Sequence, residues 1–356
     1  MIYVKKYGGS LIKNENDLSK ISYRIASEYN IYNKKEKTKF IVVISAFKNK
    51  TSQLKKTFHN LNLKTDDSNE AAYLVTGELE TAPLLAMLIN NYGVRTKALN
   101  AFQIELLTDD NYLDANIISI NKEKIDSYLE NYDIIIIAGY QGINRNGDFT
   151  TLGFNGSDLT ALYLASIYHV NCEIYKNSAL KISNSTNSPV IDNISYDQIL
   201  FLIRNGLDFL QEKLITFAKE NNQTIILKDY LTNESTMITS TETTSNYPIN
   251  ISETKHYQVK IYSPYLDSET FINLIKKIFS INNYYYNKEF LSFTQNDNEI
   301  LLLENKSMLI LNSFKNTTFV IDNITEYQII YSNLKILNIP KKDQLNLNDL
   351  LELRMC

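Results

Sequence analysis

Short apolar runs that alternate with longer amphipathic segments constrain the fold of this chain more than any other feature. Helical periodicity falls over residues 16–29, 69–91, 122–130, 157–169 and 195–220. Between these segments lie five short runs that indicate buried strands: Ile2–Lys6, Phe40–Ser45, Asp133–Gly139, Cys172–Tyr175 and Thr224–Lys228. Strands that are apolar at consecutive positions and separated by helices predict an α/β fold, with a mostly parallel sheet sandwiched by helices.

Glycine placement divides the chain into two regions. All ten glycines lie within the first 206 residues, so tight turns and anion-binding loops are expected there. Residues 232–253 are rich in Ser, Thr and Asn, which indicates a connector or a frayed edge strand. We therefore expect a first domain over residues 1–235, a linker over 236–254 and a second region over 255–356.

The second region has its own pattern. Tyr257–Ser263 indicates a strand, Ser268–Ile281 a helix, and Glu289–Thr294 with Glu299–Leu303 a hairpin. This βαββ order predicts a small α+β sandwich, a kind of module that often senses ligands or mediates dimerisation.

Composition excludes several classes of protein. The 356 residues are 44% hydrophobic, which excludes a disordered chain, and 36 basic against 40 acidic residues lack the basic excess that nucleic-acid binding requires. Two cysteines and three histidines show no spacing typical of a disulfide framework or a metal site. The apolar run that ends at Gly139 is a third of the length of a membrane span, and the N-terminus lacks a signal-peptide profile. We expect a soluble, cytoplasmic protein without a membrane partner.

A first motif, Lys6–Ser10, follows the first strand. The amides of Gly8 and Gly9 are expected to be free to cradle an anion, Ser10 adds a hydroxyl donor, and Lys6 places a positive charge beside them. The next helix is expected to be capped by Asn14 or Asn16. A Gly-Gly turn after a strand is more often only a turn, so this motif alone is weak.

A second motif, Thr150–Asp158, is a loop that leads into an apolar helix. Ser157 is able to cap this helix, and Asp158 falls in its first turn. Two interpretations remain open. The residues either form a helix cap and nothing more, or the helix start binds phosphate while Asp158 orients a metal, a lysine or the transferring group.

These motifs belong to a series of seven short segments that occur in the order and at about the spacing seen in aspartate kinases: Lys6–Ser10, Ser45–Ala46, Thr76–Glu78, Gly139–Gly142, Thr150–Asp158, Cys172–Tyr175 and Ile194–Asp197. Over residues 1 to about 235 the chain thus resembles the aspartokinase family of the amino-acid kinase superfamily. The resemblance implies ATP- and Mg²⁺-dependent phosphorylation of the side-chain carboxylate of aspartate or a related amino acid. It also implies C-terminal ACT domains, which residues 257–303 resemble, and a homo-oligomer or a pairing with a related chain.

The resemblance carries roles onto individual residues. Lys6 would neutralise the transferring phosphoryl group, and Asp158 would organise two lysine charges and magnesium. Other positions would line the phosphate path: Gly8, Gly9, Ser10, Ser45, Gly153, Gly156 and Ser157. Three residues would contact the amino acid: Thr51, Glu78, which suits its ammonium group, and Tyr140. Phosphoryl transfer needs positioning and charge neutralisation, so no histidine or cysteine is required.

The chain also departs from the family pattern. Phe154 replaces the arginine that pairs with a substrate carboxylate, and Asn155 replaces a glycine. Lys176–Asn187 replaces the nucleotide loop, and Asp208 replaces a phosphate-facing lysine. In the second region, Ser263–Asp267 replaces the effector loop.

Two functions therefore stay open. The retained Lys6 and Asp158 favour a divergent aspartokinase, or a kinase of a related acid. The loss of the arginine, of the nucleotide loop and of the phosphate-facing lysine favours a catalytically silent homologue that acts as a regulatory or scaffolding partner.

Overall fold

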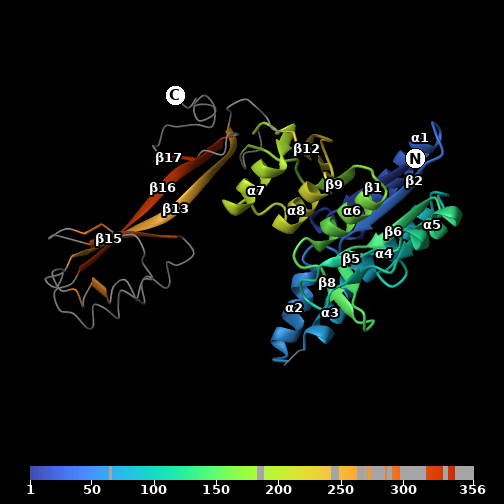
Figure 1. The fold of residues 1–356 in the computed structure, drawn as a ribbon, viewed down its shortest axis with the longest axis horizontal. Coiled ribbons are helices and arrows are strands. Elements are labelled where there is room, and N and C mark those ends of the chain that lie inside the picture. Colours follow the sequence, from blue (N-terminus) through green and yellow to red (C-terminus); the bar gives the residue numbers. More distant parts are fainter. Residues whose placement is uncertain are drawn as a thin grey trace. The chain divides into compact units, whose positions relative to one another are not determined.

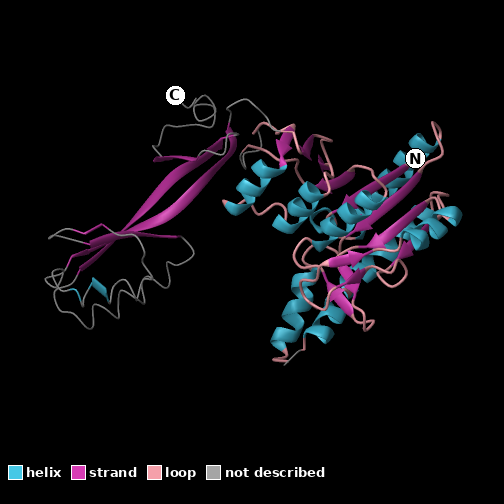
Figure 2. Ribbon diagram, viewed as in Figure 1, coloured by secondary structure: helices cyan, strands magenta, loops and turns pink. Residues whose placement is uncertain are grey.

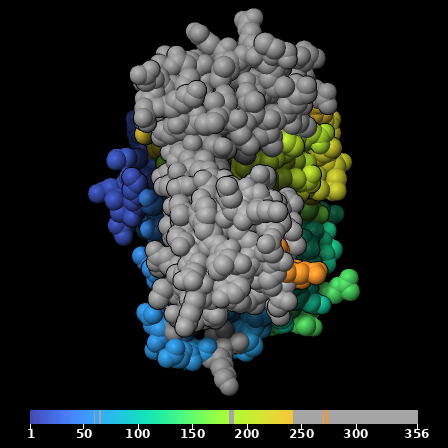
Figure 3. All heavy atoms as spheres, turned by 90° about the vertical axis from the view of Figure 1, so that its left-hand side faces the viewer, coloured from blue at the N-terminus to red at the C-terminus, as the bar shows by residue number. Residues whose placement is uncertain are grey.

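The structure is a computed structural model of the chain, and it describes residues 1–63, 66–182 and 188–241. In the C-terminal region it describes 248–262, 269, 272–273, 285–286, 291–296, 318–331 and 336–340. The chain divides into two compact units, Met1–Ile182 with Thr186–Thr244, and Ser245–Cys356 with Ser183–Ser185 (Figure 1). Described side chains lie almost entirely in the first unit, whose atoms are coloured blue to yellow in Figure 3.

An eight-stranded sheet forms the centre of the first unit. Its strand order is β10-β12-β11-β9-β1-β2-β6-β3, and every neighbouring pair is parallel except β11 with β12. The bounds are Ile2–Tyr7 (β1), Lys39–Ile44 (β2), Thr96–Leu99 (β3), Ile134–Ala138 (β6), Cys172–Lys176 (β9), Asn193–Ser195 (β10), Ile225–Asp229 (β11) and Ser235–Thr239 (β12). The five predicted strands and the mostly parallel sheet are confirmed.

Helices cover both faces of this sheet (Figure 2). On one face α1 (Glu15–Asn33) and α4 (Thr76–Asn90) pack over Phe40, Val42 and Ile44. On the other face α6 (Gly156–Ile167) packs against β1, β2 and β9. Because both faces are covered, each strand is apolar at consecutive positions rather than at alternate ones. Asn14 caps α1 by accepting a hydrogen bond from the Asp17 amide at 3.1 Å, as one of the two predicted caps.

Smaller elements surround the sheet. The helices are α2 (Lys50–Asn60), α3 (Asp67–Leu74), α5 (Lys122–Asn131), α7 (Tyr196–Arg204), α8 (Glu212–Glu220) and a 3₁₀ turn at Gly9–Leu11. A second sheet has the order β5-β4-β7-β8, with β4 at Leu107–Thr108, β5 at Ile117–Ser119, β7 at Gln141–Ile143 and β8 at Phe149–Thr151. Its strands are two or three residues long, too short for the period-2 pattern that predicts strands.

Two predicted helices differ from the structure. The segment 195–220 forms α7 and α8 rather than one helix, because Gly206 takes a φ of 97° after α7. The Leu207 amide then donates to the Leu202 carbonyl at 3.0 Å, the glycine-dependent arrangement that ends a helix. The segment 69–91 forms α3 and α4, which meet at Val75.

The segment 236–254, predicted as a linker, contains regular structure at both ends. Residues 235–239 form β12, which pairs with β10 on one side and β11 on the other and is therefore not an edge strand. The two units separate after Thr244, and β13 (Pro248–Tyr262) begins in the second unit. Serine and threonine thus give the same sequence signal in a paired strand as in a connector.

The second unit contains a five-stranded antiparallel sheet of order β14-β15-β13-β16-β17. Beyond β13 the strands are Tyr285–Tyr286 (β14), Leu291–Asn296 (β15), Thr318–Tyr331 (β16) and Ile336–Pro340 (β17). The predicted strands at 257–263 and 289–294 correspond to β13 and β15. Most of the predicted helix 268–281 and the strand 299–303 lie outside the described residues.

One described segment, Asp67–Asn90, is long and apolar enough by length and composition to cross a membrane. Half of its most apolar window is buried, and Ala82, Leu85 and Ile89 belong to the core shared with α1 and the sheet. A buried helix of a globular core passes the same test, and this packing favours that interpretation. A soluble, cytoplasmic protein remains a prediction.

Candidate active site

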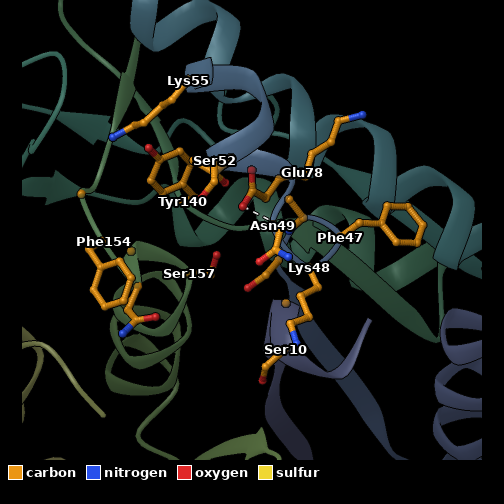
Figure 4. Close-up of a pocket in the computed structure, with 18 of the residues that line it drawn as sticks. Ser10, Phe47, Lys48, Asn49, Ser52, Lys55, Glu78, Tyr140, Phe154 and Ser157 are labelled. Atoms are coloured by element: carbon orange, nitrogen blue, oxygen red, sulfur yellow. Dashed lines mark hydrogen bonds between the residues drawn. The ribbon is translucent and has the colours of Figure 1, made fainter. Parts of the chain in front are cut away.

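A cavity of about 490 Å³ opens where β1, β2 and β6 end (Figure 4). Its wall comes from the loop after β1, the loop between β2 and α2, the start of α4 and the loop before α6. Parallel strands bring their carboxyl ends to the same edge of a sheet, which is where α/β proteins bind ligands.

All the predicted site residues come together around this cavity. Nine of them line it: Gly9, Ser10, Ser45, Thr51, Glu78, Tyr140, Gly153, Gly156 and Ser157. The other three, Lys6, Gly8 and Asp158, lie directly behind that lining. Gly8 precedes Gly9, Asp158 follows Ser157, and the Lys6 ammonium contacts the Asp158 carboxylate.

Asp158 lies between two buried lysines. Its carboxylate contacts Lys6 from β1, and its Oδ2 is 3.1 Å from Nζ of Lys176 at the end of β9. The Asp158 side chain is 1% exposed; burial alone would raise its pKa, but the two ammonium groups hold it below the usual value. Burial lowers the pKa of Lys176. Two cations with one carboxylate leave a surplus positive charge behind the cavity wall.

The glycine turn is a smaller anion cradle than predicted. The Gly8 amide is not free, because it donates to the Tyr175 carbonyl at 3.2 Å. The amides of Gly9 and Ser10 open the 3₁₀ turn, and neither has a protein acceptor among the described residues. A Cβ at position 9 would lie 2.8 Å from the Ala46 carbonyl oxygen, so the turn can approach the β2 loop this closely only with glycine there.

Ser157 is not the cap of α6, contrary to the prediction. The helix begins at Gly156 and its N-cap is Asn155, which takes a φ of 56°. Asparagine tolerates this left-handed conformation, so Asn155 can occupy a position where the family has a glycine. Ser157 lies one residue inside the helix and lines the cavity. A Cβ at Gly139 would lie 2.6 Å from Cβ of Ser157, so this glycine allows the helix start to approach the end of β6.

Glu78 is a buried carboxylate on the cavity wall. It is 3% exposed, and its Oε1 accepts a hydrogen bond from the Ala46 amide at 3.1 Å. Its Oε2 has no hydrogen-bond partner in the described part of the chain, and burial raises its pKa to about 7. Tyr140, on the same wall, takes a φ of 68°, and burial raises its pKa to about 12. A cationic group that entered the cavity could pair with Glu78.

Phe154 does not fill the cavity. Its side chain is 68% exposed and lies at the cavity edge, away from Glu78 (Figure 4). Positive charge at this wall comes instead from Lys48, Lys50 and Lys55. Lys50 pairs with Glu80 at 2.6 Å, whereas Lys48 and Lys55 form no ion pair with any described residue.

Sequence reasoning missed two sets of residues at this site. Sequence reasoning missed Lys48, Lys50 and Lys55 because α2 contains few apolar residues, of which Leu54 and Phe58 are buried. Lys176 was missed because it opens the segment that differs most from the family pattern. Its position directly after Tyr175, at the carboxyl end of a predicted parallel strand, was the signal that could have identified it.

Comparisons with known proteins agree with this geometry. The profile of the amino acid kinase family matches residues 1–229. An aspartokinase of Bacillus sp. (strain MGA3) is 29% identical over 248 residues, 68% of this chain and 59% of the relative. An aspartokinase of Rickettsia conorii is 28% identical over 314 residues, 85% of this chain and 76% of the relative. The chain therefore spans about three fifths to three quarters of the length of these relatives.

Solved structures show the same fold at lower identity. Escherichia coli aspartokinase III in complex with lysine and aspartate has a TM-score of 0.68 at 15% identity, covering 93% of this chain and 87% of that one. Clostridium acetobutylicum aspartate kinase has a TM-score of 0.60 at 18% identity, covering 93% and 86%. The family profile matches well over half of the chain, and the relatives and solved structures named above are aspartokinases. The chain therefore belongs to the amino acid kinase family, in its aspartokinase branch.

Proposed function

We propose that this chain is a phosphotransferase of the aspartokinase type, which transfers the γ-phosphoryl group of ATP to the side-chain carboxylate of aspartate or a related amino acid. The observation that carries the proposal is the buried cluster of Lys6, Asp158 and Lys176, placed directly behind a cavity lined by the glycine turn and by Glu78. Surplus positive charge at this position suits the phosphate oxygens of ATP, because negative charge develops on the leaving ADP during transfer.

The chemistry needs few groups from the protein. A carboxylate oxygen of the acceptor forms a bond to the γ-phosphorus while the bond from that phosphorus to the bridging oxygen breaks, giving an acyl phosphate and ADP. The attacking carboxylate is already ionised at neutral pH, so no general base is required. The contribution of the chain is to position the two reactants and to neutralise the phosphoryl oxygens with Lys6.

The cavity wall also suits an amino-acid acceptor. The buried Oε2 of Glu78 lacks a partner in the described residues and would pair with the ammonium group, and Thr51 and Tyr140 line the same cavity with hydroxyl groups. Lys48 and Lys55 would provide cations for the α-carboxylate, in place of the arginine that the family carries where this chain has Phe154. The volume of about 490 Å³ lies within the range of pockets for small molecules.

Magnesium would bind with the nucleotide. No group of three or more His, Cys, Asp or Glu side chains that could hold a metal occurs among the described residues. Mg²⁺ commonly uses substrate phosphates, water and only one or two carboxylates. Asp158 is enclosed between two ammonium groups, so the nucleotide phosphates and water would hold the ion. When bound, the ion would neutralise phosphate charge.

The test is formation of aspartyl phosphate from magnesium-ATP and aspartate, trapped as the hydroxamate, with Lys6→Met protein as the blank. Product above this blank, together with a higher melting temperature in magnesium-ATP, is the expected result. Absence of both product and thermal response would remove the kinase proposal and leave the silent, scaffolding homologue. A thermal response without product would point to a different acceptor, to be sought among related acidic amino acids.

Phe154→Arg tests the acceptor. Because Phe154 lies open at the cavity edge, an arginine there has room to reach the acceptor carboxylate, and kcat/KM for aspartate should rise about tenfold or more. Phe154→Leu is the matched control and should leave kcat/KM unchanged. An unchanged value for the arginine variant would mean that the acceptor carboxylate does not approach position 154.

A further inference from the structure

Lys176 occupies a position that the family resemblance does not assign to a lysine. The family's phosphate-facing lysine corresponds to Asp208 in this chain, a reversal of charge. We propose that Lys176 is the second phosphoryl-site cation of this protein, acting with Lys6 on the transferring group. This inference rests on the proposed function and assigns one further residue to the proposed reaction.

Strand register places Lys176 on the correct face. In the parallel pair of β1 and β9, Lys6 lies opposite Ile174. Side chains two residues apart in a strand share a face, so Lys176 projects from the same face as Ile174 and Lys6, toward α6. The ion pairs of both lysines with Asp158, a residue of α6, agree with this placement.

The Lys176 ammonium is held in place by groups of the chain that precede α8. Its Nζ donates to the Phe209 carbonyl at 2.7 Å and lies 4.8 Å from the centre of the Phe209 ring. Burial lowers the pKa of Lys176, and the charges of Asp158 and, more weakly, Asp208 oppose that effect. Asp208, which replaces a lysine of the family, thus adds a small favourable effect on the charge of Lys176 at the end of β9.

The charge count explains why a second lysine matters. Lys6 and Asp158 alone form a neutral pair, which leaves no surplus positive charge for a phosphoryl group. Lys176 adds that charge among the buried groups, because Asp208 is exposed and its charge is largely screened by water. The Lys176 side chain is 12% exposed, whereas Asp158 is almost fully enclosed. An approaching phosphate oxygen could therefore reach Lys176 by displacing part of its contact with Asp158.

The experiment compares Lys176→Met and Lys176→Arg with Lys228→Met. Lys228 is the matched control, a lysine on β11 that pairs with Glu173 at 2.8 Å on the opposite face of the sheet. We expect Lys176→Met to lower kcat at least about 100-fold with little change in KM for aspartate, since a transition-state contact is lost. Lys176→Arg keeps the charge and should retain at least ten times the kcat of the methionine variant. Lys228→Met should stay within about threefold of wild type.

The outcomes separate the inference from the proposed function. A wild-type protein with neither activity nor binding of magnesium-ADP, measured by calorimetry, would remove the proposed function itself. An active wild type whose folded Lys176→Met variant keeps kcat within threefold would overturn the role of Lys176 and leave the kinase intact. Equal losses in the methionine and arginine variants, with equal falls in melting temperature, would make Lys176 a structural partner of Asp158 and also overturn the inference. Where Lys176→Met does not fold, Lys176→Gln takes its place.

Discussion

Two consecutive lysines of β1 are both buried, yet they face opposite sides of one sheet and have opposite surroundings. Lys5 lies beneath α1, where Nζ donates to Glu28 at 2.9 Å, to Glu173 at 3.0 Å and to the Tyr175 hydroxyl at 3.4 Å. Lys6 faces α6, and its ion pairing within the described residues is with Asp158 alone. One face thus has a lysine between two carboxylates, and the other has a carboxylate between two lysines.

The difference shows how burial of the same residue type serves two purposes. An ammonium group has three N–H donors, and Lys5 uses all three on the protein. Burial favours its neutral form, but Tyr175 and the two carboxylates more than compensate and raise its pKa. Four aromatic rings also surround its Nζ within 6 Å. Lys5 is therefore saturated and structural, whereas Lys6 has donors left for a ligand at the cavity.

The strongest test of this contrast is Lys6→Met. We expect kcat for hydroxamate formation to fall at least about 1,000-fold, because the substitution removes the positive charge proposed to neutralise the transferring group in a water-poor site. The melting temperature should change by only a few degrees, since Asp158 keeps Lys176 as its partner. Thermal denaturation and the hydroxamate assay check the two parts. Residual turnover within tenfold of wild type would contradict the catalytic role of Lys6 and would make both lysines structural.

Lys5→Met should show the reverse behaviour. Loss of this ammonium leaves Glu28 and Glu173 less compensated, and breaking a buried pair is strongly destabilising. We expect the free energy of unfolding to fall by about 3 kcal/mol, the lower end of the usual range, because Arg24 and Lys228 still pair with these carboxylates. Urea denaturation gives the value. Turnover per folded molecule should stay within a few-fold of wild type, and a 1,000-fold loss at unchanged stability would contradict a structural role.

Glu78 extends the contrast to a carboxylate on the cavity side. Its pKa of about 7 lies above the value of about 4.5 expected in the unfolded chain, so the folded state binds the proton more tightly. Stability from this group is therefore present below pH 4.5 and is lost as the pH rises to 7. Glu78→Gln should raise the free energy of unfolding at pH 8 by about 2 kcal/mol, less than the full effect of the pKa shift because its amide would be unpaired.

Denaturation of Glu78→Gln at pH 8 and pH 4 measures this effect, and the gain should vanish at the lower pH. The same variant should bind aspartate at least tenfold more weakly at pH 8, since the proposed partner of the ammonium group is gone. In the wild type, KM for aspartate should rise as the pH falls below 7, because protonated Glu78 pairs poorly with a cation. A gain in stability that is equal at both pH values would show that ionisation of Glu78 is not its source.

The smallest effect is expected at Tyr7, on the Lys5 side. Its ring is fully buried and stacks on Tyr175 with centroids 4.7 Å apart, but its hydroxyl has no hydrogen-bond partner in the described residues. Tyr7→Phe removes an unsatisfied polar group and keeps the stacking, so stability should rise by up to about 1 kcal/mol with unchanged kcat. Urea denaturation measures the change; a loss of more than 1 kcal/mol would mean that the hydroxyl has a partner, such as buried water.

Much of this protein could be predicted from its sequence, because the signals are local. Five strands of the central sheet follow from runs of apolar residues, and the parallel α/β arrangement follows from the helices between them. The glycine turn after β1 and the loop before α6 were identified from residue type and spacing. The structure brings all twelve predicted site residues to one cavity, although their roles remain predictions.

What the tertiary structure decided depends on contacts between segments far apart in the chain. Lys5 and Lys6 are equivalent in sequence, and only the residues that α1, β9 and α6 bring to each face distinguish them. Lys176 gains its position because β9 pairs with β1 across about 170 residues. The effect of Asp208 on the charge of Lys176 likewise appears only once the chain has folded. Periodicity reports which residues are buried; which charges meet behind the cavity is fixed only when the strands pair and the helices pack on them.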